Sequence, residues 1–360
     1  TPNKMQQHLA HQRSFFDKRT TRPVKYRIQQ LKKLKKLLKE HENQLNEAIY
    51  LDFKKSAFDT ITTELSLLYA DIEEAITHTE QWASIQPKKT NLINIPARSY
   101  VIPEPLGVSL VIGAWNYPYL LSFAPAIAAI AAGCCVVLKP SEIPAHSSAA
   151  IAKLVNENFD SGFFKVVEGG IPETTALIEL PFDKIFFTGS VPVGKIVYQA
   201  AAKNLVPVTL ELGGKSPAII DDKCNLKTVV KRLIWAKYMN AGQTCIAPDY
   251  VLVHSNIYEE VLAQMKKEVN AQQYAVANEN YVQIVNQKNY ERLRALIDSN
   301  KVVHGGDCDE AARTISPTIL SNVSMEDTCM QEEIFGPILP LLSYDTLDEA
   351  IAIIKSKPKP

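Results

Sequence analysis

The chain has 360 residues, 46% of them hydrophobic, and its 39 basic residues equal its 39 acidic ones. This size and composition predict a globular protein of about two or three domains. The balanced charge excludes the net positive field with which proteins hold nucleic acid or an anionic bilayer, so a small molecule is the expected partner. The six cysteines show no C-x-x-C spacing and no histidines at zinc-ligand intervals, which predicts reduced thiols, a cytoplasmic location and no metal.

The first part of the chain is expected to be helical. Residues 1–19 have no apolar segment behind their charges, so neither a secretory signal nor a membrane anchor is expected there. Leucines at helical spacing predict an amphipathic helix over 27–53 with lysines on its outer face, and a second helix over 61–83. The lysine face is typical of a solvated surface, and peripheral membrane association stays open as an alternative.

Prolines interrupt the helical pattern in residues 84–107. They stand at positions 87, 96, 103 and 105 and flank short extended runs. This pattern predicts a pair of strands that projects from the body as an oligomerisation arm.

After residue 107 strands and helices alternate. Strands are expected at 108–115, 134–140, 164–169, 184–189 and 206–212, and helices at 118–132, 145–158, 173–180 and 193–204. A second set follows, with strands in SPAIID and YVLVH, a helix over 225–240 and further helices near 257–269 and 283–298. The alternation predicts an α/β protein of two doubly wound parallel-sheet domains with ligands at strand ends.

The expected division assigns residues 1–83 and 108–211 to a first domain and 212–360 to a second. Residues 108–138 contain no charged side chain and are long enough to cross a bilayer. Internal asparagine, proline and glycine residues divide that run, and a sheet covered on both faces also produces charge-free runs, so strand, helix and strand are expected there.

Two residues in the middle of the chain suggest catalysis. Glu211 lies between two leucines at the end of a predicted strand, where burial of a carboxylate is costly, and Gly213 and Gly214 follow. Cys245 follows a helix end broken at Gly242, a position that suits a reactive thiol. The intervening helix brings the chain back, so a nucleophile and a general base are indicated, although a buried structural cysteine stays open as an alternative.

Two motifs at predicted strand ends suit a ligand as well as a local structural role. Asn116 could donate its amide N–H to a developing oxyanion, or could simply form a turn before Tyr-Pro. Lys139 and Glu142 could hydrogen-bond ribose hydroxyls, while Ser141 and Glu142 also suit the cap of a helix.

Two further motifs are weak when taken singly. Gly189 and Gly194 enclose a turn that enters a helix, whose N-terminus could hold a phosphate. Glu333 belongs to an acidic pair before Phe335, for which a solvated turn is the default interpretation.

Together the motifs resemble the aldehyde dehydrogenase superfamily over nearly the whole chain and in the same order. They are AWNYP, KPSE, FTGSVPVG, LELGGKSP, GQTC and EEIFGP. The segment GQTCIAPDY resembles that of the class 3 branch. This branch includes fatty and aromatic aldehyde dehydrogenases and bacterial enzymes for apocarotenoid aldehydes. The resemblance implies NAD(P)-dependent oxidation of a hydrophobic aldehyde to an acid through a cysteine thiohemiacetal and thioester.

The resemblance also implies that the first domain, residues 1–83 and 108–211, binds NAD(P) and that the second, residues 212–360, is catalytic. It further implies a role for each matching residue. Cys245 would be the nucleophile, Glu211 the general base, and Asn116 with the Cys245 N–H the oxyanion hole. The implied cofactor residues are Lys139 and Glu142 for the adenosine ribose, Gly189, Ser190 and Gly194 for the pyrophosphate, and Leu212, Glu333 and Phe335 for the nicotinamide riboside.

The sequence says less about the choice of substrate and the preference between NAD and NADP than about the reaction. Tyr117 and Tyr119 suit the wall of an aromatic substrate tunnel, but packing in the core explains them equally well. Glu142 should repel a 2′-phosphate and favour NAD, whereas Lys139 offers charge that would help NADP.

Family members continue for roughly another hundred residues beyond the point where this sequence stops, by the resemblance alone. A C-terminally truncated member is therefore expected, whose full-length form is a homodimer. Two alternatives stay open: a catalytically silent relative with a binding or structural role, and a CoA-acylating aldehyde dehydrogenase, against which Glu211 argues.

Overall fold

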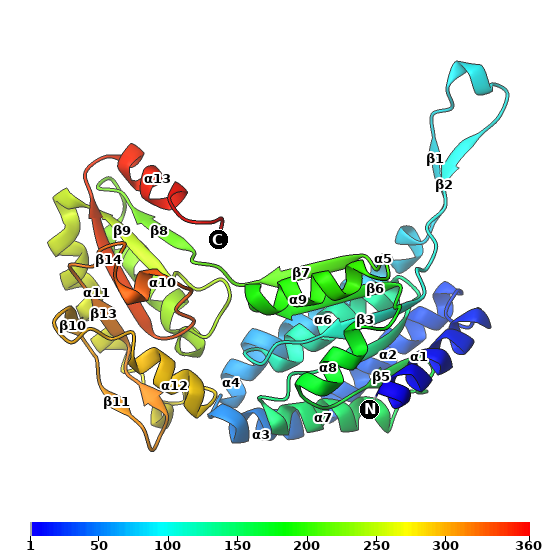
Figure 1. The fold of residues 1–360 in the computed structure, drawn as a ribbon, viewed down its shortest axis with the longest axis horizontal. Coiled ribbons are helices and arrows are strands. Elements are labelled where there is room, and N and C mark those ends of the chain that lie inside the picture. Colours follow the sequence, from blue (N-terminus) through cyan, green and yellow to red (C-terminus); the bar gives the residue numbers. More distant parts are fainter. Residues whose placement is uncertain (1) are drawn as a thin grey trace. The chain divides into compact units, whose positions relative to one another are not determined.

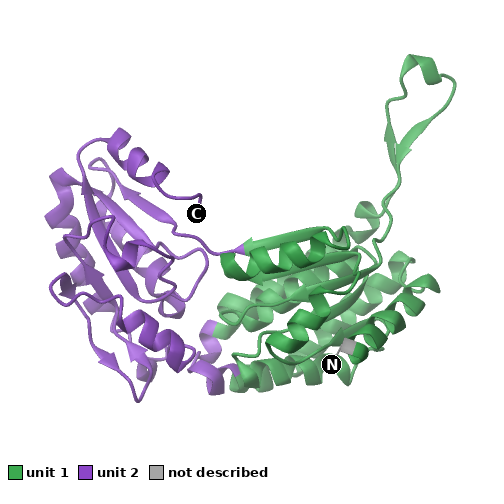
Figure 2. Ribbon diagram, in the orientation of Figure 1, with its two compact units in different colours: residues 1–48, 60–211 green, residues 49–59, 212–360 purple. Residues whose placement is uncertain are grey.

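The computed structural model describes residues 2–360, and the chain divides into two compact units (Figure 2). The first unit runs to residue 48 and resumes over 60–211, and the second comprises 49–59 and 212–360. The division differs from the expected one at 49–59, which group with the second unit because their backbone bonds there: the Gln283 N–H donates to the Phe53 carbonyl at 2.9 Å. The assignment of the units to cofactor binding and catalysis stays a prediction.

The N-terminal region is helical, as expected, but the helix predicted over 27–53 is two helices. One ends at Glu40 and the next begins at Glu42, with His41 between them. The apolar spacing continues across this one-residue break, so the sequence pattern did not reveal it. The elements of this region are α1 (Pro2–Asp17), α2 (Val24–Glu40), α3 (Glu42–Phe53), α4 (Ala57–Thr60), the π-helix η1 (Ile61–Leu65) and α5 (Ser66–Trp82).

A hairpin follows and extends away from the body of the first unit (Figure 1). Its antiparallel strands are β1 (Gln86–Lys88) and β2 (Ser99–Val101), joined through the 3₁₀ turn η2 (Leu92–Asn94). The pair of strands predicted within 84–107 is confirmed. Its tip is apolar and open to solvent, since Leu92 is 85% and Ile93 93% exposed.

The sheet of the first unit has the order β5-β4-β3-β6-β7. Chain order runs outward from β3 through β4 to β5 and then returns to β6, on the other side of β3, so the topological switch point lies between β3 and β6. The elements are β3 (Val108–Ile112), α6 (Pro118–Ala131), β4 (Cys135–Lys139), α7 (Ala145–Asn156), β5 (Phe164–Val166), α8 (Ile171–Ile178), β6 (Lys184–Gly189), α9 (Val191–Ala202) and β7 (Val208–Leu212).

Helices surround this sheet, which explains the charge-free run. Helix α6 packs against α2, α5 and α7, whereas α8 packs against α1 and α9. Every residue of β3 and of β4 is buried, as expected for parallel strands covered on both faces. The expected strand, helix and strand over 108–138 are confirmed as β3, α6 and β4. Within residues 2–360, no helix combines the length and apolar character needed to cross a bilayer.

The second unit contains a sheet of order β10-β13-β14-β9-β8 (Figure 1). The four strands β8, β9, β14 and β13 lie side by side in this order and are parallel. The edge strand β10 runs antiparallel to β13. Two parallel α/β sheets, as predicted, are therefore confirmed. The elements are β8 (Pro217–Ile220), α10 (Leu226–Tyr238), η3 (Met239–Gly242), β9 (Tyr250–His254), η4 (Ser255–Ile257), α11 (Tyr258–Gln272), η5 (Val276–Asn278), α12 (Gln287–Arg294), β10 (Val302–His304), β11 (Cys308–Asp309), β12 (Thr314–Ile315), β13 (Thr318–Leu320), η6 (Thr328–Met330), β14 (Ile338–Tyr344) and α13 (Leu347–Lys355).

Candidate active site

The first unit gathers several of the predicted site residues at one edge of its sheet. Asn116 follows β3, Lys139 ends β4, and Gly189 ends β6 just before Ser190. Strands β4, β3 and β6 are adjacent and parallel, so their carboxyl ends meet at the same edge. This edge includes the switch point, where open α/β sheets bind their ligands.

Lys139 and Glu142 form an ion pair at that edge. The Lys139 side chain is buried, and its Nζ donates to the Glu142 carboxylate at 3.0 Å and to the Pro140 carbonyl at 2.9 Å. Burial raises the pKa of Glu142, but hydrogen bonds from its own backbone and from Lys139 outweigh this and lower the pKa below its ordinary value. Glu142 is therefore an exposed carboxylate, held in place and ionised at neutral pH.

The N-terminus of α9 is suited to an anion. Its N-cap residue Ser190 is exposed and makes no side-chain cap bond, and the first turn carries no acidic side chain. The partial positive charge of such a helix end attracts phosphate. Gly194 is buried at the end of the first turn, where its N–H donates to the Ser190 carbonyl at 2.9 Å.

A buried carboxylate organises the segment that carries Asn116. Asn116 is 2% exposed, and α6 begins two residues later. Glu64, fully buried in η1, accepts the N–H groups of Tyr119 at 2.8 Å and Leu120 at 3.2 Å. A carboxylate is favoured at a helix N-terminus. Sequence reasoning missed Glu64, although a charge directly before Leu65, near the start of the predicted helix over 61–83, was a signal that could have found it.

The tunnel prediction does not hold for Tyr119. This side chain is fully buried, and its hydroxyl donates to the Leu45 carbonyl at 2.6 Å. Packing in the core, the alternative that the sequence left open, accounts for it. Tyr117 is also buried, with 6% exposed, and its role in substrate binding stays a prediction.

In the second unit, Cys245 follows an unusual turn. Asn240, Ala241 and Gly242 have φ values of 54°, 51° and 70°. A non-glycine residue in this region costs about 1–3 kcal/mol, which contacts with the surrounding structure must offset. Gln243 supplies part of that support: its buried amide donates to the carbonyls of Asn240 and Gln283, both at 3.1 Å, and accepts the Val285 N–H at 3.0 Å. Cys245 itself is a half-buried thiol.

Gly242 also joins this turn to the EEIFGP segment. A Cβ atom at Gly242 would lie 2.3 Å from the Gly336 carbonyl oxygen and 3.1 Å from the Lys237 carbonyl oxygen. Only glycine permits this approach, so the segments of Cys245 and Glu333 are packed directly together. The structure thus brings together two motifs that are far apart in the sequence.

Glu333 is half-buried, and its interpretation as a solvated acidic turn is wrong. Burial raises its pKa to about 7, helped by the charge of Asp249 and opposed by a hydrogen bond from the Gly214 backbone and by Arg292 and Lys237. The carboxylate lies against Gly213, where a Cβ would be 2.3 Å from Oε2. It therefore titrates near neutral pH.

Two further residues lie near Glu333, one along the chain and one in space. Phe335 has a left-handed φ of 49°, which sets the direction of the chain after Glu333. Lys237, in the last turn of α10, is 1% exposed, and burial lowers its pKa to about 8 against the opposing charges of Asp249 and Glu333.

Glu211 differs from the expectation. The sequence predicted a buried carboxylate, but Glu211 is exposed at the end of β7. The reason is the position of β7 at the edge of its sheet, where most of its residues are only half-buried. Leu212 follows as the last residue of the strand and is half-buried. Site residues therefore group within each unit, one set in the first and one in the second.

Comparison with known proteins shows the family of the chain. The family model described as the aldehyde dehydrogenase family matches residues 1–358. The chain belongs to the aldehyde dehydrogenase family. It is 44% identical to 4,4'-diaponeurosporen-aldehyde dehydrogenase of Staphylococcus aureus, over 99% of this chain and 79% of that protein. It is 42% identical to aldehyde dehydrogenase family 3 member A2 of Mus musculus, over 99% of this chain and 74% of that protein.

Solved structures give the same answer for the fold. The structure described as the substrate-bound state of Staphylococcus aureus AldH has a TM-score of 0.96 and 44% identity, covering 99% of this chain and 78% of that one. An aldehyde dehydrogenase of Mycobacterium tuberculosis complexed with NAD+ has a TM-score of 0.87 and 28% identity, covering 98% of this chain and 75% of that one. This aldehyde dehydrogenase is thus an oxidoreductase that oxidises aldehydes, in a family that uses NAD or NADP.

The first unit of this aldehyde dehydrogenase fits such a dinucleotide. The uncapped N-terminus of α9 suits the pyrophosphate, and the ionised Glu142 with Lys139 suits ribose hydroxyls. These groups lie beside the switch point of the sheet. In the second unit, Glu333 offers another carboxylate whose ionisation depends on pH.

Proposed function

We propose that this chain oxidises a hydrophobic aldehyde to a carboxylic acid with a nicotinamide dinucleotide, through a covalent intermediate on Cys245. The observation that carries the proposal is the turn before Cys245: three successive left-handed residues, supported by Gln243 and packed against Gly336, hold a half-buried thiol in a defined place. Strained backbone of this kind is concentrated at functional sites.

The proposed chemistry assigns one step to each residue. The Cys245 thiolate attacks the aldehyde carbon, and the amide N–H of Asn116 donates to the oxyanion of the thiohemiacetal, a contribution of about 3 kcal/mol for donors of this kind. The chemistry that a bound dinucleotide would supply is acceptance of the hydride that leaves this carbon. Glu211 then takes a proton from the water that attacks the thioester, and the carboxylic acid and the thiolate are released.

The proposed binding roles follow the motifs. Lys139 and Glu142 would hold the adenosine ribose, and Glu333 with Phe335 would hold the nicotinamide riboside. The backbone of Leu212 would contact the nicotinamide. The turn formed by Gly189, Ser190 and Gly194 would hold the pyrophosphate. Because Glu142 is ionised, it repels a 2′-phosphate, and NAD is the preferred cofactor.

A hydrophobic substrate is supported by the relatives, one of which is named for its action on diaponeurosporen-aldehyde. The test measures the absorbance of the reduced cofactor with hexanal, benzaldehyde and a long-chain aldehyde, each with NAD and with NADP. The control is Cys224→Ala, which removes another half-buried thiol. Turnover that survives Cys224→Ala and disappears in Cys245→Ala supports the proposal.

Other outcomes separate the alternatives. Turnover that is absent from the native chain while an aldehyde analogue still labels Cys245 supports a silent relative. Formation of an acyl-CoA in preference to the acid supports the CoA-acylating enzyme, and equal rates for short and long aldehydes contradict the hydrophobic preference.

The exposed hairpin suits a homodimer contact, which completes the proposal. Leu92 and Ile93 present apolar side chains to solvent, a relative from Rattus norvegicus is named as dimeric, and exposed apolar patches mark interaction sites. Sedimentation velocity on Leu92→Asp/Ile93→Asp is expected to show a monomer. The control Leu347→Asp, at another exposed leucine, is expected to remain a dimer.

A further inference from the structure

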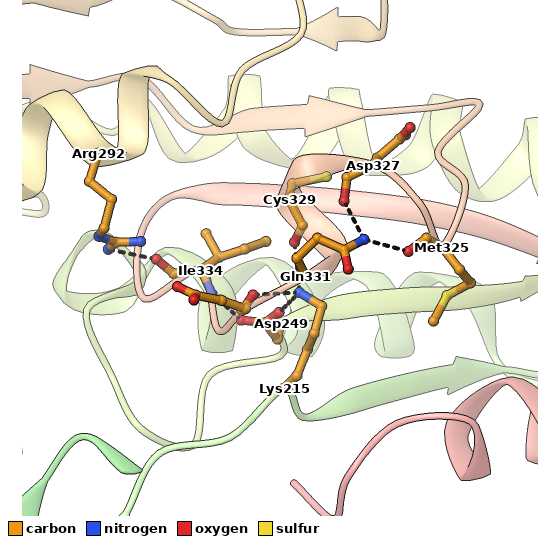
Figure 3. Close-up of polar contacts among 9 residues, drawn as sticks. Lys215, Asp249, Arg292, Met325, Asp327, Cys329, Gln331 and Ile334 are labelled. Atoms are coloured by element: carbon orange, nitrogen blue, oxygen red, sulfur yellow. Dashed lines mark hydrogen bonds and ion pairs between the residues drawn. The ribbon is translucent and has the colours of Figure 1, made fainter. Parts of the chain in front are cut away.

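Charged side chains contact the backbone of the Glu333 segment (Figure 3). The Lys215 Nζ donates to the Cys329 carbonyl at 2.7 Å and to the Glu332 carbonyl at 3.0 Å, and it forms an ion pair with the Asp249 carboxylate. Cys329 and Glu332 are thereby tied to one ammonium group.

Two more contacts hold the residue that follows Glu333. The other carboxylate oxygen of Asp249 accepts the Ile334 N–H at 2.8 Å, and the Arg292 guanidinium donates to the Ile334 carbonyl at 2.8 Å (Figure 3). The peptide groups on both sides of Glu333 are therefore fixed: the carbonyl of Glu332 before it and the N–H of Ile334 after it.

These contacts are shielded from solvent. The side chains of Lys215 and Asp249 are 10% and 4% exposed, and hydrogen bonds that involve a charged group are roughly twice as strong as neutral ones. Their positions follow from the topology, since Lys215 precedes β8, Asp249 precedes β9 and Ile334 precedes β14. Strands β8, β9 and β14 are adjacent and parallel, so their amino ends meet at one edge.

The same segment of chain also receives the side chain of Glu333. Its carboxylate lies where Gly213 has no Cβ, and the backbone of Gly214 hydrogen-bonds to it. Lys215 lies between Gly214 and β8, and its side chain contacts the backbone of the EEIFGP segment. Both the backbone and the carboxylate of Glu333 are thus fixed from residues 213–215.

We infer that Lys215, Asp249 and Arg292 are positioning residues that hold Glu333 in the orientation needed to bind the dinucleotide. This inference rests on the proposed function, because it gives these residues a purpose only if Glu333 contacts the cofactor. None of the three would touch the reacting atoms; each acts through the backbone of the segment that carries Glu333. We call these three residues the clamp.

The first test variant is Arg292→Met, which removes the donor to the Ile334 carbonyl and leaves the Lys215–Asp249 pair intact. Its matched control is Arg294→Met in the same last turn of α12, where Arg294 pairs at 3.2 Å with the exposed Glu310. Both variants lose one guanidinium, but only the first loosens the clamp. Arg292→Lys, which keeps a donor and a charge, serves as the rescue.

The second variant is the double substitution Lys215→Met/Asp249→Asn. Removing Lys215 alone would leave a buried carboxylate without its counter-charge and endanger folding. The double variant avoids this, and the amide oxygen that it introduces at position 249 can still accept the Ile334 N–H. It therefore removes the two hydrogen bonds from Lys215 to backbone carbonyls, and the net charge of the pair at positions 215 and 249 stays zero. Circular dichroism confirms that each variant is folded.

The readout is the Kd for NADH, measured by fluorescence titration without substrate. Arg292→Met and the double variant are expected to weaken NADH binding about tenfold, the equivalent of one charged hydrogen bond. Arg294→Met should match the native chain, and Arg292→Lys should recover most of the affinity. Alkylation of Cys245 by iodoacetamide without cofactor should change less than about twofold, because loss of a single contact away from the thiol should be local.

The pH dependence of binding provides a readout that a purely structural role would not move. The charged groups that act on Glu333 are Asp249, Arg292 and Lys237, with a backbone hydrogen bond from Gly214. Loss of the Arg292 charge should move the midpoint of NADH binding to higher pH. The double variant loses the opposite charges of Lys215 and Asp249 together, so its midpoint should stay close to that of the native chain. Both variants should bind NADH more weakly than the native chain at alkaline pH.

The outcomes separate this inference from the proposed function. If the native chain binds NADH and Glu333→Gln weakens binding while folded clamp variants bind normally, the inference is wrong and the proposed function stands. Equal weakening in Arg294→Met would likewise overturn it, because the effect would then not be specific to the clamp. Failure of the native chain to bind NADH or NADPH overturns both.

Discussion

Acidification should weaken cofactor binding through Glu333. Burial raises the pKa of this carboxyl from its ordinary 4.5 to about 7, so it loses its charge just below neutral pH instead of in acid. A ribose hydroxyl donates a stronger hydrogen bond to a carboxylate than to the neutral acid. The affinity for the dinucleotide should therefore follow the ionised fraction of Glu333.

The size of the effect follows from the pKa. With a pKa of about 7, roughly nine-tenths of Glu333 is ionised at about pH 8 and roughly one-tenth at about pH 6. If only the ionised form binds well, the Kd for NADH rises about tenfold between these two pH values. Each further unit of acidification adds up to another factor of about ten until a second group titrates.

Fluorescence titration of NADH at constant ionic strength measures this profile. NADH is the appropriate ligand because it lacks the 2′-phosphate of NADPH, and the second ionisation of a phosphate, near a pKa of about 6, would overlap the transition. Glu333→Gln carries no titratable group, so its profile should be flat, with weak binding at every pH. A flat profile in the native chain, or an unchanged slope in Glu333→Gln, would refute the assignment.

The contribution of Glu333 to folding stability should change with pH in the direction opposite to its contribution to cofactor affinity. A carboxyl whose pKa is raised by folding favours the folded state while it is protonated; this contribution is present below pH 4.5 and is lost as the pH rises through about 7. At alkaline pH, Glu333→Gln should therefore unfold at a temperature no lower than the native chain while it binds NADH less tightly. A large fall in melting temperature would show instead that the substitution had disordered the segment.

Three more predictions concern other parts of the site. Gly242→Ala should lower both stability and the alkylation rate of Cys245, because its Cβ would lie 2.3 Å from the Gly336 oxygen at a φ of +70°; a loss of about 3 kcal/mol in urea unfolding is expected. Glu142→Gln should improve the ratio of kcat/KM for NADP over NAD about fivefold by removing a like charge worth about 1 kcal/mol, and an unchanged ratio would show that Glu142 does not face the 2′ position. Glu64→Gln should destabilise the fold by about 2 kcal/mol, because a neutral amide accepts the Tyr119 N–H less strongly than a carboxylate; wild-type stability would contradict this capping role.

The strand and helix alternation was predictable because it rests on local patterns. Buried parallel strands produce apolar runs, and the charge-free stretch over 108–138 became β3, α6 and β4 as expected. The break at His41 was not predictable, since both helices continue the same apolar stripe. The exposure of Glu211 also depended on the order of the strands, which places β7 at an edge.

The clamp could not be predicted from local sequence. Lys215, Asp249 and Arg292 are far apart in the chain, and each is an ordinary charged residue in its own neighbourhood. They meet because parallel strands bring their amino ends together and because α12 supplies Arg292 from outside the sheet. The raised pKa of Glu333 has the same origin: a pair of adjacent glutamates predicts a solvated turn until tertiary packing buries one of them.

The chain path gives a reason for the length of the LELGGKSP motif. Glu211 and Leu212 end β7 in the first unit, and Lys215 stands just before β8 in the second. Between them, Gly213 gives room to the Glu333 carboxylate. One short connection thus ends the strand that carries the proposed general base and begins the strand whose approach carries the clamp. An insertion within residues 212–215 would leave both sheets intact but would displace Gly213 or Gly214 from the Glu333 carboxylate, so NADH binding should weaken while the protein remains folded.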